Sequence, residues 1–174
     1  MANNNIESLD INTLRLNSRA LKMPLPKFAI SGNPFFCDCN MEWLQHMNKL
    51  DGMTQYPHIL DMENVMCKLP FIRHGAFLPL SKTKPSDFLC KYRSHCFALC
   101  HCCEFDACDC EMVCPENCTC YSDQTWNTNI VDCSSQNFTS MPSVIPMDVT
   151  DLFLDSNNIF QLTSHTFIGR KNMR

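Results

Sequence analysis

Cysteine is the residue type whose number and spacing in this sequence point most directly to chemistry. Eight cysteines fall within 21 residues, namely Cys100, Cys102, Cys103, Cys108, Cys110, Cys114, Cys118 and Cys120. Thiols at this density can form disulfides, ligate zinc as thiolates or supply a catalytic nucleophile. Each of these chemistries makes a different demand on the neighbouring residues.

Zinc and thiol catalysis both fit the segment less well than disulfides do. Enough ligands for zinc are present in Cys96, Cys100, Cys102, Cys103, Cys108 and Cys110, with His95 and His101 nearby. Adjacent Cys102 and Cys103 are poorly placed as two corners of one tetrahedron, and there is no clean pair of C-x-x-C sequences. A catalytic cysteine beside either histidine would need a free thiol with a lowered pKa, whereas a thiol with so many neighbours more readily forms a disulfide. We therefore predict no metal, no cofactor and no enzymatic activity.

The composition of the whole chain favours an oxidising compartment. Fourteen of the 174 residues are cysteine, an even number close to the share that marks disulfide scaffolds. A net charge of −4, without a run of lysine or arginine, argues against nucleic acid as a partner. No apolar run is long enough to span a membrane. The amino terminus lacks the pattern of a signal peptide, so we expect a piece of a longer extracellular receptor or an incomplete gene product.

Segments with a leucine-rich-repeat pattern flank the cysteines. Asn4–Leu9 and Asn157–Leu162 share the order Asn, any residue, Ile, two residues, Leu, and Leu152 and Leu154 extend the second copy to L-x-L-x-x-N-x-I. The alternation places Leu152 and Leu154 on the core side of a short strand, and the asparagine can bond backbone groups at the bend that follows. Such a repeat buries its apolar face only against a neighbouring repeat.

The same template returns near the amino terminus at Phe28, Ile30 and Asn33. Further core candidates with irregular spacing are Leu14, Leu16, Leu21 and Leu25. Pro24 and Pro26 argue against a helix here. The region favours the end of a repeat array, with an ordinary amphipathic segment as the alternative.

A short helix is predicted after this array. Asn40 can act as its N-cap, and Trp43 or Leu44, then Met47 and Leu50, recur at helical spacing before Asp51-Gly52. We expect this helix to cover the open end of the array, with Trp43 in the core.

Two modules resemble the flanking caps of leucine-rich repeats. Asn33-Pro34-Phe35-Phe36-Cys37-Asp38-Cys39, with a following Trp-Leu and two more cysteines, resembles the C-terminal cap. That resemblance implies the disulfides Cys37–Cys67 and Cys39–Cys90, whereas the spacing alone allows three pairings. Cys114-Pro115-Glu116-Asn117-Cys118-Thr119-Cys120, followed by Cys133, resembles the N-terminal cap and implies Cys114–Cys120 and Cys118–Cys133. The six remaining cysteines, Cys96, Cys100, Cys102, Cys103, Cys108 and Cys110, allow fifteen pairings, and the sequence selects none of them.

A C-terminal cap followed by an N-terminal cap means that one array ends and another begins. The extra cysteines of the junction, from Cys100 to Met112, resemble those of invertebrate Toll receptors, and Tyr121–Trp126 and Asp148–Leu152 are similar to Toll sequences as well. The resemblance implies a leucine-rich-repeat solenoid fragment of the α/β type, with short strands and two disulfide-rich capping modules. It also implies a cell-surface parent that binds Spätzle-like cystine-knot cytokines, or a receptor partner, and signals in innate immunity or development. A secreted Slit-like guidance or adhesion protein is the alternative.

The sequence thus divides into five expected parts. These are the end of a repeat array (1–34), a C-terminal flanking cap (35–95), a cysteine-rich junction (96–113), an N-terminal flanking cap (114–147) and the start of a second array (148–174). Asn137 and Asn117 are N-glycosylation acceptors by sequence. The neighbouring Cys118, if paired, would hinder modification of Asn117.

Overall fold

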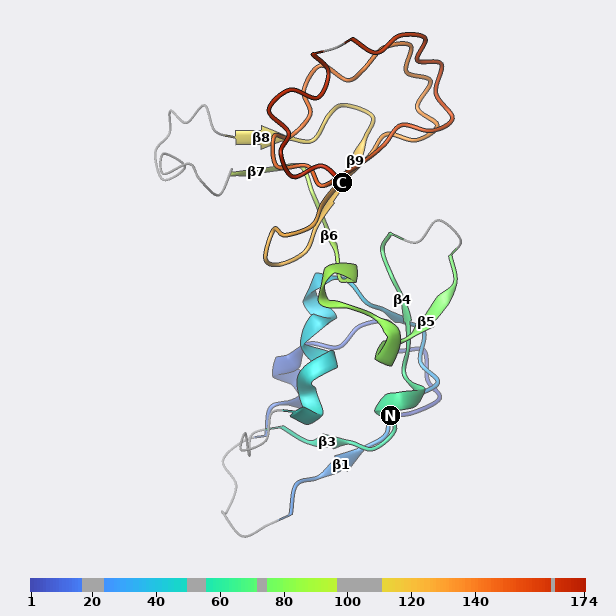
Figure 1. The fold of residues 1–174 in the computed structure, drawn as a ribbon. Helices are drawn as coiled ribbons and strands as arrows, with labels where there is room; N and C mark the ends of the chain where they lie inside the picture. The colour runs from blue at the N-terminus through green and yellow to red at the C-terminus, as the bar shows by residue number, and fades with distance from the viewer. Residues whose placement is uncertain (17–23, 50–55, 72–74, 97–110, 164) are drawn as a thin grey trace. The chain divides into compact units, whose positions relative to one another are not determined.

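The computed structural model describes residues 1–16, 24–49, 56–71, 75–96, 111–163 and 165–174. The chain forms two compact units, Met1–Cys90 and Lys91–Arg174 (Figure 1). The described residues are strand-rich, and their strands are two to four residues long. The five-part division and the extended solenoid stay predictions.

In the first unit, short strands from successive passes of the chain lie side by side. β1 (Lys27–Phe28) pairs with β3 (His58–Ile59) in parallel, and β2 (Phe35–Phe36) pairs with β4 (Met66–Lys68) in the same way. β5 (Phe77–Pro79) runs antiparallel to β4 and completes a sheet of order β2-β4-β5. Short 3₁₀ helices lie before, between and after these strands: η1 (Ile11–Leu14), η3 (Met62–Asn64), η4 (Leu80–Lys82) and η5 (Pro85–Asp87).

The predicted helix after the first array is present, but it is a 3₁₀ helix, η2 (Cys39–Lys49). Met41, Leu44 and Met47 are buried, and a spacing of three places them on one face because a 3₁₀ helix has three residues per turn. The N-cap prediction was wrong. Asn40 lies inside η2, and its backbone N–H donates to the carboxylate of Asp38 at 2.9 Å.

These elements enclose an apolar core in the first unit. Ile30, Phe35, Leu44, Ile59 and Phe88 are almost fully buried within it. Leu14 joins this core and Trp43 packs against it, as expected. Leu25 does not, since 39% of it is exposed, and Leu21 lies outside the described residues.

The second unit is built on a hairpin. β9 (Thr119–Ser122) and β10 (Asn129–Asp132) pair antiparallel, and β11 (Asp151–Phe153) adds to β10 in parallel. The sheet order is β11-β10-β9-β6, where β6 is Cys90–Tyr92. A separate two-stranded sheet joins β7 (Ser94–Cys96) to β8 (Glu111–Val113).

A small core lies under the second sheet. Its buried members are Cys120, Val131, Cys133, Ile145 and Val149. Leu152 and Leu154, both expected in the core, are partly buried and pack against it. In the part of the chain that the structure describes, no helix has the length and apolar character needed to cross a membrane.

Candidate functional site: two disulfide caps and a buried polar cluster

Two disulfides hold the first unit. Cys37–Cys67 connects the residue after β2 to the middle of β4, with 5.4 Å between the Cα atoms, and both cysteines are fully buried. Cys39–Cys90 connects the start of η2 to the end of the unit, with a Cα separation of 5.2 Å. These bridges close loops of 30 and 51 residues. They are the two pairs that the resemblance to the C-terminal cap implies.

Two further disulfides hold the second unit. Cys114–Cys120 fastens the segment after β8 to β9, and Cys118–Cys133 fastens the start of β9 to the end of β10. Their loops are short, at 6 and 15 residues. These are the pairs implied by the resemblance to the N-terminal cap.

The junction cysteines are described only at their edge. Cys96 is disulfide-bonded. Cys100, Cys102, Cys103, Cys108 and Cys110, together with His101, lie outside the described residues. Within the described ranges, no group of three or more His, Cys, Asp or Glu side chains could hold a metal ion.

Asn33 bonds the backbone of two neighbouring passes of the chain in the first unit. Its Oδ1 accepts from the backbone N–H groups of Asn4 and Ile6, at 3.1 and 3.2 Å. Its Nδ2 donates to the carbonyls of Met1 and Ile30, at 3.0 and 2.6 Å. Only 5% of Asn33 is exposed, so this amide replaces water for four backbone groups.

Asn157 has the same bonding pattern in the second unit. Its Oδ1 accepts from the N–H groups of Gln136 and Phe138, both at 3.0 Å. Its Nδ2 donates to the carbonyls of Cys133 and Leu154, both at 2.8 Å. In each unit the asparagine side chain thus accepts from two N–H groups that lie two residues apart in the preceding pass of the chain. It also donates to the carbonyl three residues before the asparagine. The first part of one unit and the last part of the other thus use the same repeat geometry.

Asp61 connects two successive passes of the chain in the first unit by accepting hydrogen bonds from the backbone of the earlier one. Its two carboxylate oxygens accept from the backbone N–H groups of Ile30 and Ser31, at 2.9 and 2.8 Å. Burial alone would raise the pKa of Asp61, but hydrogen bonds from the Ser31 side chain and from both N–H groups outweigh that effect. The pKa of Asp61 therefore lies below its ordinary value.

A mostly buried cluster of side chains connects three stretches of the second unit, residues 92–95, residues 126–129 and Asp148. His95 Nε2 lies 2.7 Å from Asp148 Oδ2, and Asn129 Nδ2 donates to Asp148 Oδ1 at 2.9 Å. The Tyr92 hydroxyl donates to Asn129 Oδ1 at 2.6 Å. The ring of Trp126 stacks on His95, with 4.1 Å between the centroids. We call these five residues the His95 cluster.

The electrostatics of the His95 cluster keep Tyr92 neutral. Burial raises the pKa of Tyr92 above its ordinary value, and the negative charge of Asp148 raises it further. The hydrogen bond with Asn129 acts in the opposite direction but does not offset the increase. Tyr92 is therefore a neutral hydroxyl donor to Asn129.

Sequence reasoning named only one member of this cluster for chemistry, His95, and named it for zinc or catalysis. The other members come from segments as many as 53 residues away in sequence, and no local pattern joins them. Trp126 and Asp148 belong to two stretches that the sequence marked as similar to Toll receptors. That similarity was the one signal that could have led to the cluster.

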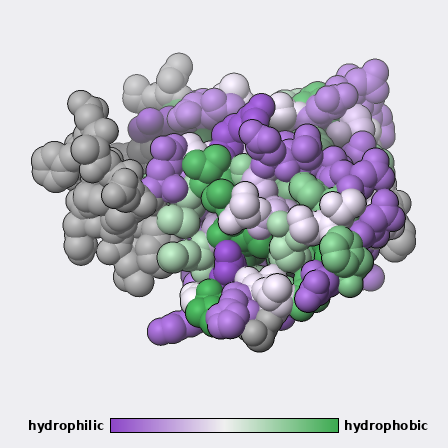
Figure 2. Space-filling view, turned by 90° about the horizontal axis from the view of Figure 1, so that it is seen from above, coloured by the Kyte–Doolittle hydropathy of each residue, from purple (hydrophilic) through white to green (hydrophobic). Residues whose placement is uncertain are grey.

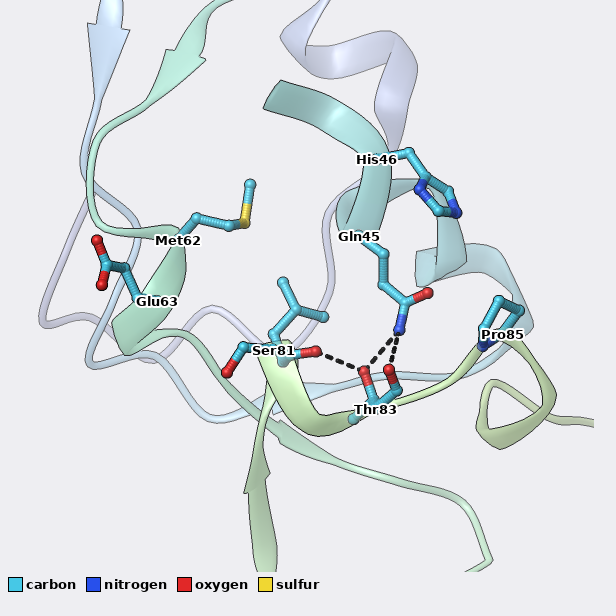
Figure 3. Close-up of a pocket in the computed structure, with 8 residues that line it drawn as sticks. Gln45, His46, Met62, Glu63, Ser81, Thr83 and Pro85 are labelled. Carbon is cyan, nitrogen blue, oxygen red and sulfur yellow. Dashed lines mark hydrogen bonds between the residues drawn. The ribbon is translucent and has the colours of Figure 1, made fainter. Parts of the chain in front are cut away.

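A groove of about 500 Å³ lies among η2, η3, η4 and η5 in the first unit. Figure 3 shows Gln45 pointing across it to Thr83, where its Nε2 donates to the Thr83 carbonyl at 2.9 Å and the hydroxyl at 2.7 Å. Met62, Leu80 and Pro85 give the groove an apolar wall. The Gln45 amide is thus hydrogen-bonded within the protein, across the groove.

Both glycosylation acceptors lie at the surface. Asn137 and Asn117 are exposed, and each has a positive φ, 58° and 61°. Such φ values are typical of asparagine in turns. Cys118, which follows Asn117, is paired with Cys133.

Comparison with known proteins finds a match over nearly the whole chain. No family model matches. Toll-like receptor 7 of Drosophila melanogaster is 53% identical over 171 residues, which cover 98% of this chain and 12% of that protein. Protein toll of the same organism is 22% identical over 150 residues, or 83% of this chain and 12% of that protein. A solved Toll–Spatzle complex matches with a TM-score of 0.41 at 16% identity, over 84% of this chain and 21% of that one. The chain thus spans about an eighth of the curated relatives that it matches over most of its length.

Proposed function

This chain belongs to the ectodomains of Toll-type receptors, and from that premise we propose that it is the segment where one leucine-rich-repeat array is closed and a second is opened. Its relatives are receptors, so the segment is extracellular and non-enzymatic. Its proposed role is structural. It caps two arrays and holds them in a fixed relation within the parent.

The order of the two bonding patterns supports this proposal. Asn33 bonds a repeat-like pass to the residues before it, and the disulfides of Cys37 and Cys39 follow directly. In the second unit the disulfide of Cys118 comes first, and the Asn157 pattern follows. A cap thus follows the repeat in one unit and precedes it in the other.

Exposed apolar side chains near residue 160 support a following repeat. Phe160, Leu162 and Ile168 are 82%, 57% and 66% exposed. In a repeat array such side chains are covered by the next repeat. On the face seen in Figure 2, hydrophobic residues occur in small groups among hydrophilic ones.

The finer role concerns the parent receptor. We propose that it binds a cystine-knot cytokine of the Spätzle type or a receptor partner, as the resemblance to Toll receptors implies, and that it signals in innate immunity or development. We place the segment on the extracellular face of the plasma membrane. The relatives matched over most of the chain are Toll-type, which favours this interpretation over a Slit-like protein.

Glycosylation is proposed at Asn137 in preference to Asn117. Both are exposed, but the residue after Asn117 is a disulfide-bonded cysteine. A closed Cys118–Cys133 bridge restricts the extended conformation that a transferase needs. Peptide mass spectrometry of the secreted chain should find the larger glycan occupancy at Asn137.

The decisive experiment replaces residues 90–133 of the parent with a Gly/Ser linker of equal length, which behaves as a flexible coil. Signalling in response to the cytokine should fall on the order of tenfold or more at equal surface expression, since effective concentration depends on geometry. The control is the parent with Lys82→Ala and Lys84→Ala, two exposed positions in the first unit. Undiminished signalling from the linker variant would refute a geometric role.

A further inference from the structure

The β7–β8 hairpin has little means of stabilising itself. Its strands are three residues long and pair as Ser94 with Val113, His95 with Met112, and Cys96 with Glu111. Figure 1 shows the two strands side by side. A two-stranded sheet of this size is at best marginally stable in water. The hairpin must therefore be held by something outside its own ladder.

His95 is the side chain that attaches this hairpin to the second cap. Ser94, Cys96, Glu111 and Val113 are exposed, whereas the side chain of His95 is only 5% exposed. Its Nε2 lies 2.7 Å from Asp148 Oδ2, and a carboxylate can only accept, so Nε2 carries the hydrogen. Asn129 donates to the other oxygen of Asp148, so both oxygens are hydrogen-bonded within the unit.

Trp126 contributes a second, independent observation. It has φ +57°, a left-handed conformation that bulky residues rarely adopt. The turn is closed by a bond from Trp126 N–H to the Asp123 carbonyl at 3.3 Å, and the Asp123 carboxylate accepts from the Thr128 N–H at 3.0 Å. This strained backbone places the indole on the His95 ring, with an interplanar angle of 18°. Strain of this kind persists where the surrounding contacts compensate for it.

Tyr92 completes the enclosure of His95. Its ring meets His95 edge-on at 4.9 Å and Trp126 at 5.2 Å. His95 Nδ1 is buried without a hydrogen-bond partner. Among the described residues, no group of three or more His, Cys, Asp or Glu side chains could hold a metal ion. The contacts that His95 does make, with Asp148 and with the ring of Trp126, fix the position of its imidazole.

We propose that the His95 cluster is a noncovalent lock that holds the β7–β8 hairpin, the base of the cysteine-rich junction, on the second cap. This inference deepens the proposed function and rests on it. The bridges Cys114–Cys120 and Cys118–Cys133 join residues of the cap to one another, and neither includes a residue of β7 or β8. Cys96 of β7 is itself disulfide-bonded. The lock adds a noncovalent contact between β7 and the segment that contains Asp148. It fixes the direction in which the chain enters and leaves the junction.

Hydrogen exchange of the whole oxidised chain, read by mass spectrometry, tests the lock. His95→Phe keeps an aromatic ring against Trp126 but removes the bond to Asp148. Exchange at residues 94–96 and 111–113 should rise on the order of tenfold, because a hydrogen bond to a charged group is lost. Exchange in β9 and β10 should change less than about twofold. His58→Ala, an exposed histidine of the first unit, is the control and should alter neither region.

Trp126→Gly is a second variant, which distinguishes loss of the lock from a general loss of stability. Glycine relieves the left-handed strain, so a tryptophan without a positioning role would give a more stable second unit on replacement. The lock predicts the opposite at the hairpin, namely faster exchange in β7 and β8 despite the relaxed turn. Both variants should retain Cys114–Cys120 and Cys118–Cys133 in disulfide mapping.

Two results would overturn the lock: unchanged exchange at β7 and β8 in both variants, or an equal rise throughout the second unit. The second result would reduce the cluster to ordinary core. Because these measurements need no ligand and no parent receptor, their failure is separate from failure of the linker experiment.

Discussion

The two units have different interiors, although we propose a capping role for both. The first buries large apolar side chains such as Phe35, Leu44 and Phe88. The core of the second is smaller, and half-cystines are two of its five buried members, against two of thirteen in the first. Around that core lie buried polar residues: Ser122, Asp123, Thr128, Asn129, Asp148 and Thr150.

This difference implies different sensitivities to mutation. An apolar interior loses stability when a cavity is made, whereas a polar interior loses it when one partner of a hydrogen bond is removed. Buried polar networks also specify a single arrangement when every member is bonded. We infer that the first unit is held mainly by packing within long disulfide loops, and the second mainly by hydrogen bonds within short ones.

Disulfide removal should have the largest effect on stability, and the size of this effect should differ between the two units. Chain entropy predicts that opening Cys37–Cys67, with its loop of 30 residues, costs roughly 3.5 kcal/mol, against roughly 2 kcal/mol for Cys114–Cys120 with its loop of 6. The variants are the double substitutions to alanine at each pair. Urea denaturation, followed by hydrogen exchange in each unit, measures both costs. Equal costs would show that loop length does not govern how these caps are stabilised.

Replacement of Thr150 should have an intermediate effect on the second unit. Its Oγ1 accepts from the Asn129 N–H at 2.9 Å, and Asn129 is fully buried. Thr150→Val keeps the shape and leaves that N–H without a partner, at a cost of about 1 to 3 kcal/mol.

Thr83→Val in the first unit is the matched variant. The Thr83 hydroxyl donates to the Leu80 carbonyl at 2.7 Å, but Thr83 is only half-buried, so water can replace the lost bond. Its cost should stay below about 1 kcal/mol. Denaturant midpoints of the two variants give the comparison, and a larger cost at Thr83 than at Thr150 would contradict the assignment of hydrogen bonding to the second unit.

Sequence alone could predict the features that local patterns carry. The comparisons confirm the resemblance to Toll receptors. The template also marked Asn33 and Asn157, both of which bond backbone groups of the preceding pass. Those bonds depend on spacing within one repeat, which a sequence displays directly.

Two other features could not be predicted, for physical reasons. A spacing of three in Met41, Leu44 and Met47 fits a 3₁₀ helix and an α-helix almost equally over so few residues, and packing decides between them. The His95 cluster brings together side chains separated by 37 and 53 residues. Such a cluster follows from the tertiary fold, and no periodicity of the sequence predicts it.

The smallest expected effect is a dependence of the first unit on acid, centred on Asp61. A carboxyl whose pKa is lower in the folded than in the unfolded state stabilises the fold above its unfolded pKa, and this stabilisation is lost as the pH falls through the folded value. Acidification below pH 4 should therefore speed hydrogen exchange at residues 27–31, where the N–H groups of Ile30 and Ser31 are bonded. Asp61→Asn should remove that acid dependence, whereas Glu63→Gln at an exposed neighbour should retain it. If Asp61→Asn keeps the full acid response, the carboxylate is not what holds this pass of the chain, and the first unit relies on packing more completely than its hydrogen bonds suggest.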